Sequence, residues 1–570
     1  MIVAGAVLAV MLGAFGVGVW GVRLARTTSD LYVASRAVSS WWNAAAISGE
    51  YLSAASFLGI AGLEMKLGAS VLWLPVGFAA GYLALLFFVA APLRRFGSYT
   101  IPDFAEARLS SPRVRIVAAG VVLTIGGFYL VPQLKGAGLT LGSVAGTPYW
   151  VGVVAVGAVV ALTVALGGMR GVTYVQAYQY WVKTFGIALP ACLLLIYVGG
   201  LPERSALFGR ELPRAPEGGL VVKLDSPQRV EFPDAARFTV DSRPERASAG
   251  EERTLSGRVV LPAGATVPVS EGTEAQRGGD WSRPVERSGP ASPVFVYSLL
   301  LATFLGTMGL PHILVRFYTN PDGRAARSTT VRVLGLLGIF YLFPAVYGAL
   351  GRALTPELYV KGATDAVVLE LPKAAWPGLG GEILAALTAA GAFAAFMSTA
   401  SGLLVSISGT LSHDVRRSSP ADPPALRMGR FRRAALAGMV VPATLALFAR
   451  GLDISVLVGW AFALAASTFC PLFLLGIWWR GLTARGAMAG MATGGTLASI
   501  GIFTTLVAGP VDGTLGALLA QPAAVSVPCA FVAMIGASVT DPERPRNTEA
   551  TMLALHAPEG LGLEGLRSRA

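Results

Sequence analysis

Residues 41–63 read WWNAAAISGEYLSAASFLGIAGL, an apolar run whose middle holds the polar stretch Ile47-Ser48-Gly49-Glu50. A helix needs roughly 20 apolar residues to cross about 30 Å of hydrocarbon. Serine, glycine and a carboxylate in the middle of such a run predict that the helix is interrupted there. Broken backbone at that depth is tolerated only where it lines a cavity or is buried in protein. The stretch therefore predicts a membrane-spanning helix with a break near its centre.

The composition of the whole chain agrees with this prediction. Of 570 residues, 54% are hydrophobic and only 14% are charged, which is too few charges to coat a soluble globule of this size. The first run has no Lys or Arg in its first twenty residues, so we expect a retained helix rather than a signal peptide. Thirteen apolar runs predict an all-α integral membrane protein, at 1–22, 41–63, 70–93, 114–133, 149–167, 174–200, 294–317, 331–351, 383–411, 434–450, 453–479, 486–508 and 515–538.

The basic residues indicate how the chain is oriented. The net charge is +12, and with an outside N-terminus the inside segments carry 25 Lys and Arg while the short outside loops carry six. This is the positive-inside bias of membrane proteins. We therefore expect a multi-pass protein of the cell's inner (plasma) membrane with a cytoplasmic C-terminus. The basic excess orients the chain, and a nucleic-acid partner is discounted.

Two segments depart from the membrane pattern. Residues 201–293 carry 13 basic and 14 acidic side chains, and the orientation places them outside as a hydrophilic insert. The alternating stretches 237–240 and 257–261 suggest a few strands joined by turns, and a largely disordered loop is the alternative. The polar segment 539–570 is expected to be a cytoplasmic tail.

A second interruption predicts an internal repeat. The run 294–317 contains Gly306-Thr307-Met308-Gly309-Leu310-Pro311, which matches in position the break in 41–63. Paired breaks in two halves are typical of inverted-repeat transporters, whose substrate and ion sites lie at the breaks. The two blocks would be 41–200 and 294–479. Ordinary helix packing is the alternative, because glycine is common in membrane helices.

Glu50 is the one carboxylate that we find deep inside a predicted span. A charge there costs at least about 2.5 kcal/mol on insertion scales, so it usually faces a cavity or a partner. Glu50 lies either near a translocation path or against freed backbone amides, where it only holds the break in shape. We expect Arg316 to be a cytoplasmic anchor and Lys183 to extend toward the inner interface. His312 is expected to be a polar packing residue, and a proton or anion role is the alternative.

The pair Ser398-Thr399 in the run 383–411 is a candidate cation site. Hard cations prefer oxygen ligands, and two hydroxyls with the Ala395 carbonyl could supply three of them. Backbone carbonyls of Ala44 and Ile47, from the interrupted run, could complete the shell without any formal negative charge. The alternative is that both hydroxyls bond carbonyls of their own helix or pack against a neighbour.

The sequence argues against an enzyme. Three histidines, no Walker-type phosphate loop and no paired catalytic carboxylates leave no catalytic constellation and no organic cofactor site. Cys192, Cys470 and Cys529 lie in apolar runs and are expected to be small buried hydrophobes. Without an ATP site, uphill transport would use an ion gradient.

Several motifs together resemble one family. Residues 47–59 (ISGEYLSAASFLG) closely resemble the second span of the sodium:solute symporter family, in its acetate and monocarboxylate permease branch. Further agreement comes from 167–171 with Val175-Gln176, 309–319, 396–404 and 482–487. The resemblance covers nearly the whole chain except 201–293 and the tail.

The resemblance implies thirteen transmembrane helices with a LeuT-like 5+5 inverted-repeat core, with spans 486–538 outside the repeats. It implies sodium-coupled uptake of a short-chain monocarboxylate such as acetate. Ala46 stands where proline transporters have an aspartate, and Tyr51 stands where sugar transporters have a glutamine. Acetate permeases often have Asp where this chain has Glu50. The implied sodium ligands are Ala44, Ile47, Ala395, Ser398 and Thr399, and the implied solute-binding residues are Glu50, Tyr51, Ser53, Phe57, Thr307 and Gly309.

Three other functions stay open at this point. Proton coupling would use Glu50 as the titrating group. A solute sensor could use the same helix bundle, and it would need a signalling domain. A passive channel is disfavoured because the sequence has no repeated ring of pore-lining charges.

Overall fold

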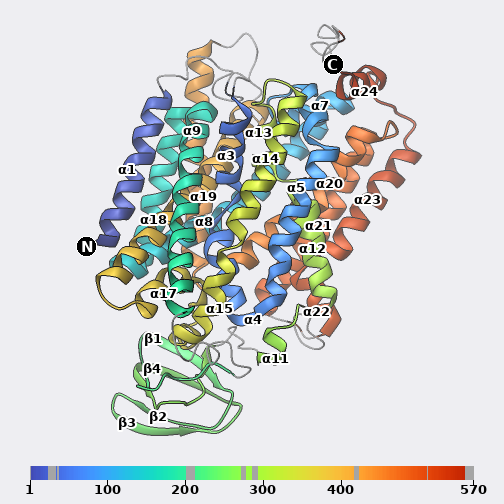
Figure 1. Ribbon diagram of the computed structural model, residues 1–570. Helices are drawn as coiled ribbons and strands as arrows, with labels where there is room; N and C mark the ends of the chain where they lie inside the picture. Colours follow the sequence, from blue (N-terminus) through green and yellow to red (C-terminus); the bar gives the residue numbers. More distant parts are fainter. Residues whose placement is uncertain are drawn as a thin grey trace.

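Most of the molecule is a bundle of helices whose axes are roughly aligned, and one small β-sheet lies beyond one end of the bundle (Figure 1). The computed structural model describes residues 2–22, 34, 38–199, 212–270, 278–284, 293–415, 423–509, 511, 513–558 and 561. The N-terminus of α1 (Ile2–Val22) lies toward the end that carries the sheet. The last helix, α24 (Thr548–His556), lies at the opposite end.

Ten helices among the described residues are long and apolar enough to cross a membrane. One of them, α9 (Tyr149–Gly199), contains two predicted spans, which meet at Gly168. There φ is 55° and ψ is −160°, a conformation that glycine adopts at little cost. The other main helices are α5 (Trp73–Phe88), α6 (Ala90–Phe96), α7 (Ile101–Leu109), α8 (Pro112–Ala145), α14 (Gly323–Tyr341), α15 (Pro344–Leu354), α17 (Val367–Ala375), α18 (Leu379–Gly409) with the turn η5 (Thr410–Val415), α19 (Pro424–Phe448), α20 (Ile454–Trp478), α21 (Ala484–Ala508), α22 (Gly513–Ala520) and α23 (Ala523–Thr540).

The helix that begins at Ser40 is interrupted, but later than the sequence predicts. α3 (Ser40–Tyr51) continues through Ser48 and Gly49, and the chain leaves the helix at Leu52 and Ser53. A π-helical turn, η2 (Ala55–Gly59), and α4 (Ile60–Leu67) follow. A Cβ on Gly49 would collide with the backbone of Gln176 in α9. Gly49 therefore allows close packing of α3 on α9 and does not itself end the helix.

A second interruption divides the first helix after the sheet. α12 (Pro293–Thr307) ends before Met308, and α13 (Pro311–Phe317) begins at Pro311. Leu310 has φ −74° and ψ 115°, the extended conformation that a following proline favours. The break thus lies inside the stretch 306–311 that the sequence indicates.

The hydrophilic insert contains an antiparallel sheet with the strand order β3-β2-β4-β1-β5. The stretches predicted to be extended lie in β2 and β4, and the rings of Phe232 and Phe238 stack at 4.9 Å inside the sheet. Trp281 Nε1 donates to the Glu64 carbonyl at 2.8 Å and so ties the segment after the sheet to α4. The strands are β1 (Leu220–Phe232), β2 (Ala236–Val240), β3 (Arg243–Ala247), β4 (Glu251–Leu261) and β5 (Val269–Ser270).

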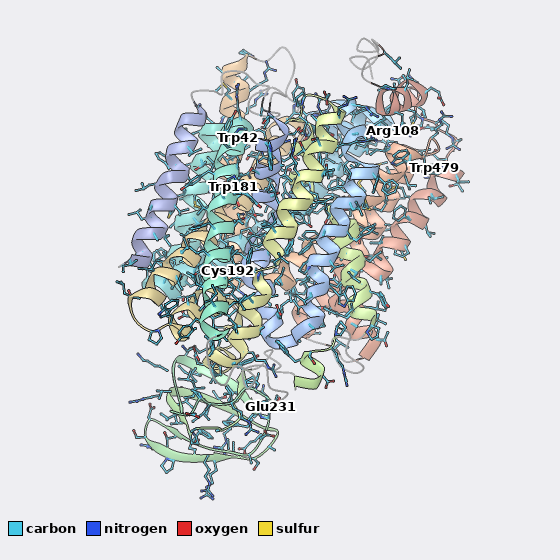
Figure 2. The ribbon with its side chains drawn as sticks, in the orientation of Figure 1. Trp42, Arg108, Trp181, Cys192, Glu231 and Trp479 are labelled. Carbon is cyan, nitrogen blue, oxygen red and sulfur yellow. The ribbon has the colours of Figure 1, made fainter. Side chains whose placement is uncertain are left out.

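The cysteines differ from one another in burial. Cys470 is buried and Cys529 is half-buried, but Cys192 is exposed on α9, so the expectation that all three are buried is wrong for Cys192. Figure 2 shows Cys192 on the surface of the helix bundle. Its neighbours Leu195 and Ile196 are exposed too. An apolar helix face that is open in this way suits contact with lipid.

Helices α21 and α23 pack closely along a row of glycines. Gly486, Gly490 and Gly494 recur every four residues, so they lie on one face of α21 and allow the backbones to approach. A Cβ on Gly490 would lie 2.6 Å from Met534 Cβ and 2.9 Å from the Ala530 carbonyl oxygen.

We expect Gly490→Ala to reduce the free energy of unfolding by about 1–3 kcal/mol, because the added methyl forces the two helices apart. Thermal unfolding of the purified protein in detergent measures this. Gly120→Ala on α8 is the matched control, since a Cβ there has no atom within 4 Å. Equal melting temperatures for the two variants would contradict the packing described.

Candidate functional site

The break after α3 leaves backbone carbonyl groups without helical partners in the interior. The last four carbonyls of any helix lack an N–H partner within it. Here Ser398 Oγ donates to the Gly49 carbonyl at 2.6 Å, and Thr399 Oγ1 donates to the Glu50 carbonyl at 2.5 Å. Both hydroxyls belong to α18 and are fully buried. The predicted pair on α18 and the predicted break on α3 therefore meet.

Lys183 reaches the same break from α9. Its Nζ donates to the carbonyls of Gly49 and, at 2.7 Å, Leu52, and to Ser398 Oγ at 2.7 Å. Its side chain is 0% exposed, so the prediction that it extends toward the inner interface is wrong. Trp181, two residues earlier, lies on the outer surface of the bundle (Figure 2). Lys183 thus lies on the inward face of α9, where three oxygens replace the water that its charge would lose.

A buried ion pair joins the two broken helices. Arg316 on α13 contacts Glu50 on α3, with 2.6 Å between Nε and Oε2, and both side chains are almost fully buried. Arg316 also donates to Thr173 at 2.6 Å and to Gln176, both on α9. Gln176 in turn donates to the Ser398 carbonyl at 2.7 Å. The prediction that Arg316 is a cytoplasmic anchor is therefore wrong, because its guanidinium binds Glu50 in the interior.

Three of the residues expected to bind sodium surround the break. Ser398 Oγ lies 3.0 Å from the Ala395 carbonyl oxygen, which places Ala395 beside the Ser398 and Thr399 hydroxyls. Ala44 and Ile47 are buried in the same helix as the break. The α3 carbonyls that contact the α18 hydroxyls are those of Gly49 and Glu50, nearer to the end of α3 than Ala44 and Ile47.

Among the residues expected to bind solute, Tyr51 and Thr307 are in direct contact, and the others pack separately. Tyr51 and Thr307 contact each other across the two breaks, with 2.8 Å between their hydroxyl oxygens, and Glu50 precedes Tyr51. Ser53 lies in the break itself, where it is buried. Phe57 is buried, with its ring centroid 6.1 Å from that of Phe340. Gly309 packs against the backbone of α20 at Ala465.

An aromatic and polar cluster adjoins Tyr51. The rings of Tyr51 and Tyr82 lie 4.6 Å apart, and the rings of Tyr129 and His312 lie 5.3 Å apart. Phe462 lies between them, within 6.1 Å of Tyr51 and 5.8 Å of Tyr129. Within the described part of the chain, the Tyr82 hydroxyl and both His312 ring nitrogens have no hydrogen-bond partner. Buried polar atoms usually have partners, so these three are available to a bound molecule.

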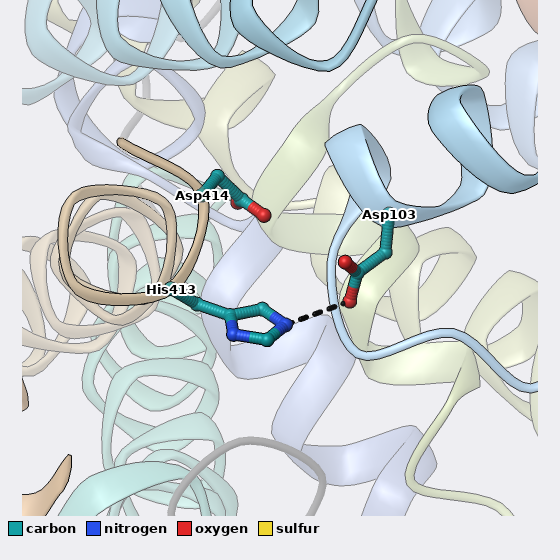
Figure 3. A group of neighbouring side chains, drawn as sticks. All are labelled: Asp103, His413 and Asp414. Atoms are coloured by element: carbon teal, nitrogen blue, oxygen red, sulfur yellow. Dashed lines mark hydrogen bonds and ion pairs between the residues drawn. The ribbon is translucent and has the colours of Figure 1, made fainter. Parts of the chain in front are cut away.

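A second set of charged side chains lies where η5 meets α7 (Figure 3). One ligand atom from each of Asp103, His413 and Asp414 lies within 4.8 Å of the others, so the three could hold a metal ion. Arg115 already binds two of them, however, at 2.7 Å from Asp103 Oδ1 and 2.7 Å from Asp414 Oδ1. The arrangement is an ion-pair network that ties α7, α8 and η5 together.

Asp103 is the member of this network that lies on the short helix α7. Burial raises its pKa, but the hydrogen bond from His413 and the charge of Arg115 outweigh burial and hold the pKa below its ordinary value. His413 Nε2 lies 3.0 Å from Asp103 Oδ2. The ionised form of Asp103 therefore stabilises the folded state.

Comparison with known sequences identifies the kind of protein that this chain resembles. The sequence model described as "Sodium:solute symporter family" matches residues 31–226 and 259–494. The "Monocarboxylic acid transporter" of Corynebacterium glutamicum is 31% identical over 562 residues, which cover 95% of this chain and 92% of that protein. The "Uncharacterized symporter YwcA" of Bacillus subtilis is 29% identical over 520 residues, 89% of this chain and 88% of that protein.

A solved structure has the same fold. The Na+-coupled sialic acid symporter in its substrate-bound outward-open state superposes with a TM-score of 0.67 at 15% identity, covering 95% of this chain and 99% of that one. At this identity the likeness shows the fold alone. It confirms the helical, LeuT-like membrane fold that the sequence motifs imply.

We expect Glu50→Gln and Arg316→Met each to lower the free energy of unfolding by about 3–5 kcal/mol, because each leaves one buried charge unpaired. The free energy of unfolding of the double variant should fall by less than the sum of the two single losses, since neither charge remains. Unfolding of the purified proteins measures the coupling. Arg327→Met, at an exposed site on α14, is the control. Strictly additive losses would be inconsistent with the ion pair.

We expect Asp103→Asn to cost about 1–3 kcal/mol of stability at pH 7, because hydrogen-bonding groups around a buried carboxylate lose their acceptor. The pKa of Asp103 is lowered in the folded state, so this stabilisation is present above the unfolded pKa of about 3.9. It is lost as the pH falls through the folded pKa, and the wild-type and variant melting temperatures should converge there.

Asp280→Asn is the control for this measurement, because the Asp280 pair with Arg283 is half-exposed and such pairs contribute little. A difference between wild type and Asp103→Asn that does not shrink below pH 4 would refute the assignment.

Proposed function

The chain belongs to the sodium:solute symporter family, and from this membership we propose that it takes up a short-chain monocarboxylate, such as acetate, together with sodium. The family consists of transporters, so the chain is not an enzyme. Uptake would proceed by alternating access, in which the two sides of the bundle open in turn around the broken helices.

The charge balance at the break carries this proposal. Two basic side chains, Arg316 and Lys183, and one acidic side chain, Glu50, are buried together at the break, so basic groups outnumber acidic ones there. An uncompensated buried charge is costly. The carboxylate of a small organic anion would neutralise it. The name of the Corynebacterium relative, a monocarboxylic acid transporter, supports the same class of solute.

We propose that the solute lies beside the two breaks, near Glu50, Tyr51, Ser53, Phe57, Thr307 and Gly309. The hydrogen bond between Tyr51 and Thr307 would mark one wall. The unpartnered Tyr82 hydroxyl and His312 ring could donate to the carboxylate. The aromatic rings around Tyr51 leave an apolar surface for a short alkyl group, as in most small-molecule sites.

The proposed sodium ligands are the Ala395 carbonyl, the Ser398 and Thr399 hydroxyls, and the carbonyls of Ala44 and Ile47. The close contact of α18 with the end of α3 supports this choice, because it brings neutral oxygens from two helices together. Sodium would then stabilise the conformer in which the solute site is formed. An ion shifts such an equilibrium only by its differential affinity for the two conformers.

We further propose thirteen transmembrane segments, with 41–200 and 294–479 as inverted repeats of five helices each and 486–538 outside them. The N-terminus and the insert 201–293 would face outside, and the tail 539–570 would face the cytoplasm. The sheet and α24 lie at opposite ends of the helices in Figure 1, which agrees with an insert and a tail on opposite sides of the membrane. Proton coupling through Glu50 is the alternative, in which the Glu50 carboxylate would leave its ion pair with Arg316 when it takes up a proton.

We expect the double variant Ser398→Ala with Thr399→Ala to raise the sodium concentration for half-maximal uptake at least about tenfold, equivalent to the loss of 1.4 kcal/mol of binding free energy. Uptake of radiolabelled acetate, propionate, pyruvate and lactate into proteoliposomes, with and without a sodium gradient, tests solute and ion together.

Ser401→Ala and Ser408→Ala are matched controls for this experiment. Their hydroxyls bond carbonyls of their own helix, at Met397 and Leu404, so their removal should leave sodium dependence unchanged. Unaltered sodium dependence in the Ser398 and Thr399 variant would refute the proposed site.

A further inference from the structure

A basic cleft lies at the end of the bundle that is opposite the sheet. It has a volume of about 780 Å³, and its walls are the turn from α7 to α8 (109–113), the first turns of α21 (484–488) and the segment 541–547 that follows α23. Arg108, next to this turn, and Trp479, which precedes α21, mark this end of the bundle in Figure 2. Basic groups outnumber acidic ones in the lining: the charged residues are Arg113, Arg485, Arg544 and Arg546, with Asp541 and Glu543.

Hydrogen bonds hold the wall 541–547 against the bundle. Arg544 Nη1 donates to the Gly481 carbonyl at 2.8 Å. The buried Asp541 carboxylate accepts a hydrogen bond from the Thr483 side chain and another, at 3.1 Å, from the backbone N–H of Glu543. Arg544 and Asp541 therefore build the wall, and the cleft is a formed feature of the folded chain.

The other three arginines of the cleft are exposed and unpaired. Among the residues that the structure describes, no carboxylate forms an ion pair with Arg113, Arg485 or Arg546. The charge of Asp541 acts on Arg485, but its oxygens are bonded to its own wall. Arg113 and Arg485 lie in the first turns of α8 and α21, where free N–H groups add positive partial charge. Because guanidinium groups match the oxygens of phosphate, the cleft suits an anion that carries a phosphate group.

The surroundings of the cleft indicate that it lies where the hydrocarbon meets the headgroups. Ile116, one turn after Arg113 on α8, is 65% exposed, and Val539, near the end of α23, is 63% exposed. Large apolar side chains that are open in this way suit lipid. Trp478 at the end of α20 is exposed as well, and tryptophans are enriched at the membrane–water interface. The unpaired arginines therefore lie at the depth of lipid phosphates.

We propose that this cleft binds the headgroup of an anionic phospholipid, with Arg113, Arg485 and Arg546 around its phosphate. The acyl chains lie along the exposed apolar faces of α8 and α23. The bound lipid neutralises the three guanidinium groups and ties the segment 541–547 to the bundle. Basic pockets at the cytoplasmic ends of membrane helices favour such headgroups. Only the choice of leaflet rests on the orientation proposed above, and neither the solute nor the coupling ion enters the argument.

The test measures lipid binding to the purified full-length protein in a neutral detergent at constant ionic strength. Phosphatidylglycerol is added in mixed micelles, and the rise in melting temperature reports binding to the folded state. The melting temperature of the wild type should rise to a plateau. The triple variant Arg113→Gln, Arg485→Gln and Arg546→Gln should need at least about tenfold more lipid for half of this rise, because each arginine near an anionic surface contributes about a factor of five. Phosphatidylcholine should have little effect, since its choline cation offsets the phosphate charge.

A second triple variant is the matched control. Arg324→Gln, Arg327→Gln and Arg432→Gln remove the same charge from exposed positions on α14 and α19 that do not line the cleft. This variant should keep the wild-type response to phosphatidylglycerol. The single variants Arg113→Gln and Arg485→Gln should each raise the lipid requirement about fivefold, and they serve if the triple variant of the cleft does not fold.

The proposal is overturned if phosphatidylglycerol does not stabilise the wild type, or if the cleft variants respond to it as the wild type does. An equal loss in the control variant would also overturn it, because the effect would then belong to the overall charge. Inorganic phosphate and glycerol 3-phosphate distinguish the source of the phosphate group: if either stabilises the wild type as strongly as the lipid does, the cleft holds a soluble anion instead. The measurement involves no transport, so its failure would leave the proposed solute and ion untouched.

Discussion

The structure depends on how the unpaired backbone at the end of α3 is satisfied. Carbonyl groups without partners inside a bilayer are costly, and α3 presents several of them where it ends. An ammonium from α9 and two hydroxyls from α18 pair with the carbonyls of Gly49, Glu50 and Leu52. The carbonyl oxygens at the break carry partial negative charge, so they favour hydrogen-bond donors and cations as partners. The cation site that we propose at this point uses the same property of the broken helix.

The two broken helices are also tied to each other. The Glu50–Arg316 ion pair joins α3 to the last turn of α13, and the Tyr51–Thr307 hydrogen bond joins the end of α3 to the end of α12. Gln176 extends the first contact to the backbone of Ser398. These contacts connect the oxygens at the α3 break with the second broken helix. In a symporter, ion and solute must bias the same conformer, and these contacts link the two places that we propose for them.

Much of the fold can be predicted from the sequence, because the length of a hydrophobic run and the residues that break a helix are local signals. The interrupted helices and the meeting of Ser398 and Thr399 with the first break agree with the sequence. The exact end of α3 was not predictable, because Gly49 is required by packing against Gln176. The sequence alone predicts Lys183 and Arg316 to lie at the membrane surface, because long cationic side chains usually extend there. Their true positions depend on which face of α9 or α13 points inward, which only tertiary packing decides.

An experimental structure of the protein in sodium-free buffer tests the central claim most directly. The account predicts a helix that stops near Leu52, with Lys183 Nζ at hydrogen-bonding distance, about 3 Å, from the Gly49 and Leu52 carbonyls and Ser398 Oγ. A helix that continues without interruption from Ser40 to Leu67, or a Lys183 side chain turned toward the membrane surface, would contradict it.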